Sequence, residues 1–152
     1  MAMVVYPALH EGSHAAVAWL LGAPVAEMRV LSAPYVRCDV GRASTVAVEC
    51  IGWSGSVLPW LGSVLLRPRS FWGWYAVFVW RCIAVFSCVL AGVSTLLYIW
   101  GTPLPYDDVT QLLTLFPHHW RGYLLLSAVL SVTGTVLLAR ERPFHRCVAY
   151  FV

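Results

Sequence analysis

The chain has 152 residues, of which 60% are hydrophobic and 11% are charged, with a formal net charge of +3. A soluble domain carries about 25% charged residues, so this composition and the mean hydropathy of +0.73 favour a membrane protein. The positive charges are few and scattered, which argues against nucleic acid as a partner. The five cysteines contain no C-x-x-C pair and do not make a disulfide framework. We expect one integral membrane domain over residues 1–152.

The first predicted element is a helix over residues 1–22, which is apolar except around the spacing H-E-x-x-H at His10, Glu11 and His14. Residues four apart share one face of a helix, so both histidines can reach one metal ion, while Glu11 lies one step round, where it can hold a water. Three ionisable side chains in one apolar turn are costly in lipid without a function. The pattern therefore predicts a Zn²⁺ site with His10 and His14 as ligands and Glu11 as the catalytic base, rather than two histidines on a plain helix face.

The next segment, residues 25–49, contains two stretches, 25–31 and 43–49, that alternate loosely between apolar and polar residues. Both stretches are rich in β-branched side chains, which is typical of strands. The residues between them include proline, glycine and aspartate, which favour turns. We therefore expect a β-hairpin or small sheet at the membrane surface.

Three apolar segments follow, at 51–66, 71–100 and 121–139, and each is predicted to be a membrane helix. The first is rich in Gly and Ser, the small residues that let membrane helices approach closely. If the second begins at Phe71, Arg81 lies inside it and needs a partner. The predicted fold class is a mainly α-helical membrane protein with about four transmembrane helices and a small β-hairpin between the first and the second.

Four membrane segments place the N-terminus, the turn at 67–70 and the tail on one side of the membrane. Because arginine and lysine are enriched on the cytoplasmic side, we compared the two sides by their positive residues. The tail side has one arginine more than the other, which predicts a multi-pass protein of the cell membrane with a cytoplasmic tail. The tail side holds Arg67, Arg69, Arg140, Arg142 and Arg146, and the other side holds Arg29, Arg37, Arg42 and Arg121.

A catalytic zinc usually takes three protein ligands and keeps one position for water, so two histidines are incomplete. Asp107 and Asp108 follow a proline-containing stretch, residues 103–106, that restricts the backbone before them. We predict Asp107 as the third ligand and Asp108 as the alternative, although Asp108 could instead cap a turn that begins at Val109. Four further residues are weaker candidates for the third ligand, because their positions in the sequence are typical of surface or interfacial side chains: His118, His119, Glu27 and Glu49.

The segment from His10 to Val25, which reads H-E-G-S-H-A-A-V-A-W-L-L-G-A-P-V, resembles the first core helix of the site-2 protease family of intramembrane zinc metalloproteases. The Gly- and Ser-rich segment that follows, and the proline-containing segment before Asp107, take the places of two further family motifs by their order along the chain. The resemblance covers about residues 8 to 112. The chain departs from the family pattern because it contains no asparagine and has Asp108 where the family has glycine.

The resemblance implies a zinc endopeptidase that hydrolyses peptide bonds of a membrane-embedded protein or peptide through a zinc-activated water. It also implies that the hairpin presents the substrate by strand addition. The expected partners are this substrate and the lipid bilayer. The alternative function is a non-catalytic membrane partner or regulator that retains a structural metal site, and a third is a four-helix membrane subunit without metal.

Overall fold

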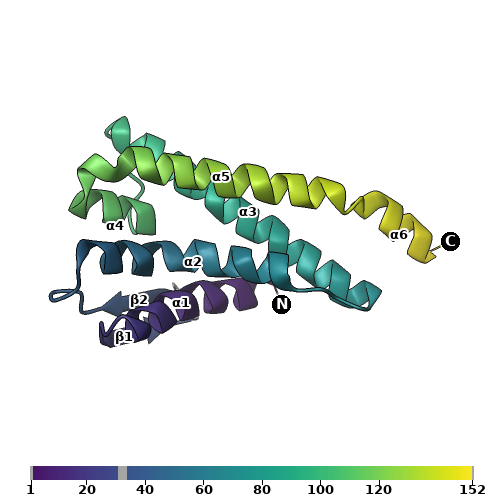
Figure 1. Ribbon diagram of the computed structural model, residues 1–152, viewed down its shortest axis with the longest axis horizontal. Coiled ribbons are helices and arrows are strands. Elements are labelled where there is room, and N and C mark those ends of the chain that lie inside the picture. The colour runs from purple at the N-terminus through teal and green to yellow at the C-terminus, as the bar shows by residue number, and fades with distance from the viewer. Residues whose placement is uncertain (1, 31–33, 152) are drawn as a thin grey trace.

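The computed structural model describes residues 2–30 and 34–151 and shows a mainly helical chain with one small β-hairpin (Figure 1). The prediction of a mainly α-helical chain with a hairpin between its first two helices is confirmed. Residues 31–33 of the predicted hairpin lie outside the described residues. The elements are α1 (Ala2–Leu20), β1 (Val25–Arg29), β2 (Tyr35–Cys38), α2 (Thr45–Leu65), α3 (Phe71–Ile99), α4 (Asp108–Leu115), the 3-10 helix η1 (Pro117–His119), α5 (Trp120–Arg140) and α6 (Pro143–Phe151).

The hairpin is shorter than the predicted segment 25–49. Its strands pair antiparallel, with Arg29 opposite Tyr35 and Val25 opposite Cys38. Most of the second predicted strand, 43–49, is instead the start of α2, which begins at Thr45 because the side chain of Ser44 accepts a hydrogen bond from the backbone N–H of Ala47 at 3.2 Å. Such a cap satisfies one of the free N–H groups of a first helical turn, and here it outweighs the alternating pattern.

The helices pack in sequence order, so that α1 lies on α2, α2 on α3, and α3 on α5 (Figure 1). The short helix α4 packs against α2 and α3. Small residues on α2 make these contacts close, since a Cβ built on Gly52 would lie 2.6 Å from Leu112 of α4. The largest buried cluster joins α2, α3, α4 and α5 through Trp53, Ala91, Val109, Leu112, Leu113 and Tyr123.

The helix α3 does begin at Phe71, and Arg81 is buried inside it with a partner. Its guanidinium forms an ion pair with Glu141 at the end of α5 and donates a hydrogen bond to the carbonyl of Ser63 on α2. The indole of Trp74 donates to the same Glu141 at 3.0 Å. The partly buried ion pair and the hydrogen bond to Ser63 therefore tie α2, α3 and the end of α5 together.

Two helical stretches of the described chain are long and apolar enough to cross a membrane. They are Phe71–Ile99 and Pro117–Tyr150, and the second continues from η1 through α5 into α6. Length and composition thus support two membrane-spanning helices, while the remaining two of the four predicted helices correspond to α1 and α2.

Candidate metal centre

The two histidines lie on the face of α1 that packs against α2, and α2 fixes the ring of His14. The Nδ1 of His14 lies 2.6 Å from the carbonyl oxygen of Ile51. Because a carbonyl can only accept, Nδ1 must carry the hydrogen, which leaves Nε2 with a lone pair in the neutral imidazole. Ser54 donates to the same carbonyl at 2.6 Å. The hydrogen bond from Nδ1 of His14 to the Ile51 carbonyl lies on the nitrogen opposite Nε2. Proteins usually orient a metal-binding histidine by such a bond on the nitrogen that does not bind the metal.

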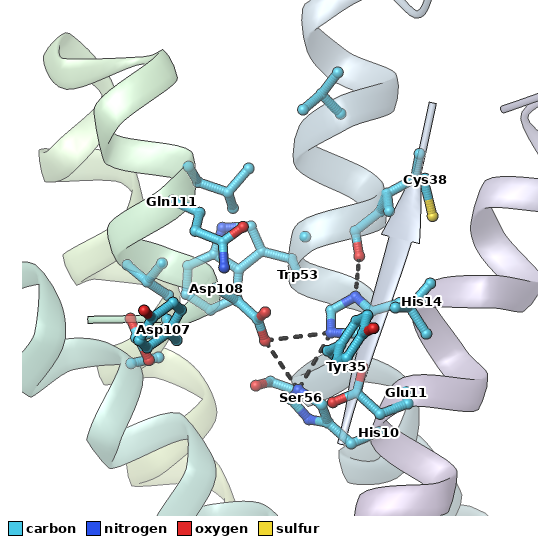
Figure 2. A pocket seen from close by; sticks show the side chains of 18 of the residues that line it. His10, Glu11, His14, Tyr35, Cys38, Trp53, Ser56, Asp107, Asp108 and Gln111 are labelled. Carbon is cyan, nitrogen blue, oxygen red and sulfur yellow. Dashed lines mark hydrogen bonds and ion pairs between the residues drawn. The ribbon is translucent and has the colours of Figure 1, made fainter. Parts of the chain in front are cut away.

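Three side chains from α1 and α4 converge on one point, as Figure 2 shows. The Nε2 atoms of His10 and His14 are 3.2 Å apart, and Asp108 Oδ2 lies 2.9 Å from the first and 3.2 Å from the second. Ligands about 2.0–2.1 Å from one tetrahedral ion lie roughly 3.3–3.4 Å from each other. The three atoms therefore have nearly the spacing of three corners of a tetrahedron, and the described residues could hold a metal ion here.

The chemistry of these three atoms also fits a cation. Burial alone would raise the pKa of Asp108, but its hydrogen bonds to His10 and His14 hold the pKa of this carboxyl well below its usual range. The carboxylate is therefore ionised, and an ionised carboxylate can only accept. Since Nε2 of neutral His14 also can only accept, the pair needs an added proton or a metal ion between them.

The structure brings Asp108 to the histidines and not the first choice, Asp107. The carboxylate of Asp107 caps α4 by accepting a hydrogen bond from the backbone N–H of Thr110 at 3.0 Å. In Figure 2 its side chain is directed away from the imidazoles. Asp108 is the first residue of α4, so its side chain is free to reach across to α1. Asp108 therefore takes the place predicted for Asp107 at the metal centre, and Asp107 takes the capping role predicted for Asp108.

Glu11 is buried beside the two histidines but does not belong to the group of side chains that could share one ion. Figure 2 shows its carboxylate next to His10, at the edge of the same cavity. A carboxylate in this place can exchange a proton with a water near the site without binding the ion itself.

The site opens into a cavity of about 860 Å³ between the hairpin and the helices α2, α3 and α4. One wall is β2, whose residues from Tyr35 to Cys38 all line the cavity. In the described sheet β2 pairs with β1 alone, and the backbone of Val36 on β2 already forms a hydrogen bond with Glu11. The other backbone groups on the outer edge of β2 can pair with an extended peptide.

The remaining sequence candidates do not join this group in the described part of the chain. Glu49 accepts hydrogen bonds from Tyr123, at 2.6 Å, and from His119, at 2.5 Å, at a separate cavity between α2 and α5. Glu27 pairs with Arg29 on the hairpin at 3.1 Å. Glu49 therefore links α2 to η1 and α5, whereas Glu27 pairs within its own strand.

One residue that the sequence reasoning did not single out is Gly55 on α2. A Cβ at this position would lie 2.3 Å from Nε2 of His14 and 2.7 Å from Cε1 of His10. The Gly- and Ser-rich composition of 51–66 correctly indicated close helix packing, but not that one glycine makes room for the two imidazoles.

No protein-family model, no curated protein and no solved structure matches this chain.

Proposed function

We propose that the protein is an intramembrane zinc metallopeptidase of the site-2 protease type. The observation that carries the proposal is the convergence of His10, His14 and Asp108, with the buried Glu11 beside this group but outside it. His10, His14 and Asp108 would hold Zn²⁺, and the fourth side of the group faces the cavity. When bound, zinc lowers the pKa of a coordinated water to about 7 and polarises a carbonyl group.

The chain's own residues would perform the rest of the reaction. Glu11 takes a proton from the attacking water and passes it to the nitrogen of the leaving amine as the peptide bond breaks. The Ile51 carbonyl keeps His14 in the tautomer whose Nε2 is available. The edge of β2 holds the substrate backbone extended beside the site.

A membrane-embedded substrate fits the surroundings of this cavity. As part of the proposal, α1 and α2 join the two long helical stretches as membrane helices, since 19 and 21 residues give helices of about 28 and 31 Å, close to the roughly 30 Å hydrocarbon core. A substrate helix hides its carbonyls in its own hydrogen bonds and must unwind before it can be cut. Pairing with β2 would supply hydrogen bonds to the backbone groups that unwinding leaves without a partner.

The test uses the full chain purified in detergent and then reconstituted in vesicles. Mass spectrometry of the metal should find about one zinc per chain in the native protein and in Glu11→Gln, and little in His14→Ala. The probe for hydrolysis is a synthetic single-span peptide with a Gly-Pro break in its membrane helix. The native protein should cut this peptide, and Glu11→Gln should not, although it retains zinc.

The other outcomes separate the competing functions. Bound zinc without cleavage of any such peptide would favour the non-catalytic partner or regulator with a structural metal site. Absence of zinc from the native protein would favour the membrane subunit without metal. Loss of zinc in Glu11→Gln would mean that Glu11 is a ligand and that its assigned role is wrong.

A further inference from the structure

A second feature of the molecule, which the metal centre does not use, is a group of exposed arginines at one end. We call it the arginine end. Two of its members lie in the turn between α2 and α3, and the others lie where α5 ends and α6 follows. In Figure 1 these segments occupy the same end of the molecule. The arginine end consists of Arg67, Arg69, Arg140, Arg142 and Arg146, all exposed.

Contacts between α3 and the segment around α6 hold this end together. The ring of Phe71 stacks on Tyr150 with centroids 3.9 Å apart, and the guanidinium of Arg146 lies 5.5 Å from the centre of the Trp74 ring. Trp74 also donates to Glu141, just before α6. The arginines of the turn and of the tail therefore belong to one surface.

The positive charge of the arginine end is not balanced by the protein. Of the seven acidic residues in the chain, Glu141 alone falls within these segments, and its carboxylate is bound by Arg81. In the part of the chain that the structure describes, the ion pairs involve none of the five arginines. Five like charges on one small surface repel one another unless anions come close.

The length of α3 places this surface at the level of lipid headgroups. Its 29 residues give a helix of about 43 Å, which matches the roughly 40–45 Å thickness of a bilayer including its headgroup layers. Trp72 and Tyr75, near its start, are 64% and 47% exposed, as expected for residues of an interfacial aromatic belt. In α6 the polar and apolar residues separate onto opposite sides more strongly than in the other described helices, which is typical of a helix lying in the interface plane.

We infer that the arginine end binds the phosphate groups of anionic lipids in one leaflet. A guanidinium presents paired donors that match the geometry of phosphate oxygens, and all ten positive residues of this chain are arginine. The inference needs the membrane location of the proposed function but not the peptide hydrolysis. A preference of about fivefold for each fully engaged arginine is the expected scale at low salt.

The experiment compares two spin-labelled lipids, phosphatidylglycerol and phosphatidylcholine, in phosphatidylcholine vesicles that contain the full chain. Electron paramagnetic resonance measures the fraction of each lipid that the protein immobilises. We expect phosphatidylglycerol to be immobilised about fivefold or more in preference at low salt, and this preference to shrink at high salt because salt screens exposed charges.

Two variants with four substitutions each locate the effect. Arg140 is left in place because it lies at the C-terminus of α5, where a cation stabilises the helix dipole. The preference should fall in the first variant to no more than the roughly fivefold of the one remaining arginine, Arg140, and stay as in the native protein in the second. The first is Arg67→Gln, Arg69→Gln, Arg142→Gln, Arg146→Gln, and the matched control is Arg29→Gln, Arg37→Gln, Arg42→Gln, Arg121→Gln.

Several results would overturn the inference. The first is equal immobilisation of the two lipids by the native protein, and the second is an equal loss of lipid preference in both variants. The third is loss of the preference when inorganic phosphate replaces chloride at constant ionic strength, which would indicate a site for soluble anions. If the first variant does not fold, the double variant Arg142→Gln, Arg146→Gln replaces it, and an unchanged lipid preference in that variant would overturn the inference. A chain that carbonate washing removes from the vesicles would refute the membrane location itself, whereas a retained chain without lipid preference refutes only this inference.

Discussion

The contact between Gly55 and the two imidazoles predicts that a single added methyl group will damage the metal centre. In Gly55→Ala the new Cβ would lie 2.3 Å from Nε2 of His14, and ordinary contact begins near 3.4 Å. His14 therefore has to move by about 1 Å, but it is 6% exposed and is held by the Ile51 carbonyl. Disturbing the groups that orient a metal-bound histidine typically costs ten- to a hundredfold in metal affinity, which is about 1.4–2.7 kcal/mol.

The matched control is Gly12→Ala, inside the same H-E-x-x-H segment. A Cβ at Gly12 would meet nothing within 4 Å, so this variant gains the helix propensity of alanine, about 0.5–1 kcal/mol, without a clash. Zinc affinity is measured by competition with a coloured chelator, and folding by thermal unfolding. We expect Gly55→Ala to bind zinc ten- to a hundredfold more weakly than Gly12→Ala at comparable helix content. Equal affinities in the two variants would refute the argument that Gly55 makes room for the ligands.

Three further predictions concern other parts of the molecule. Asp108→Ala should lose most bound zinc, whereas Asp107→Ala should keep it and lose only the helix cap, about 1 kcal/mol of stability; metal analysis and thermal unfolding of both variants decide between the roles. Arg81→Met alone should cost about 1–3 kcal/mol because it leaves the partly buried Glu141 without its cation, and the added change Glu141→Gln should restore part of this, as chemical unfolding would measure. The pKa of Glu27 is lowered by a hydrogen bond from Tyr35 and by nearby arginines, so the stability that this carboxylate gives the hairpin is present above its ordinary pKa and is lost as the pH falls through the lowered value. The protection factors of the hairpin amides, corrected for the intrinsic pH dependence of exchange, should therefore fall on acidification in the native protein and not in Glu27→Gln.

The sequence predicted the part of the site that is local in the chain. His10, Glu11 and His14 lie within five residues, so helical spacing alone places both imidazoles on one face. The third ligand comes from α4, and here the sequence offered two adjacent aspartates. Either can cap a helix, and the choice depends on the residue at which α4 begins. The first residue of α4 is set by the hydrogen bond from the Thr110 N–H to the Asp107 carboxylate and by the packing of Leu112 and Leu113. A single sequence does not reveal these contacts.

The errors in the fold have a similar origin. Residues 45–49 read as a strand because they alternate and are β-branched, yet one hydrogen bond from Ala47 to Ser44 starts a helix there. The position of Arg81 within an apolar segment does predict that it needs a partner, since a buried cation in an apolar helix needs an anion. It does not identify Glu141, which lies 60 residues further along the chain. Contacts between distant segments depend on how the helices pack, and local patterns carry little of that information.

The separation of the ligands along the chain has a consequence for biosynthesis. Asp108 is 98 residues beyond His10, and at roughly 5–20 residues per second a ribosome needs about 5–20 s to cover that distance. During this interval the nascent chain has α1 and the hairpin but lacks the carboxylate that completes the site. Under the proposed function, a newly made protein would be inactive until α4 has been synthesised and has packed against α2. The order of the ligands in the gene would thereby delay proteolysis until most of the fold is in place.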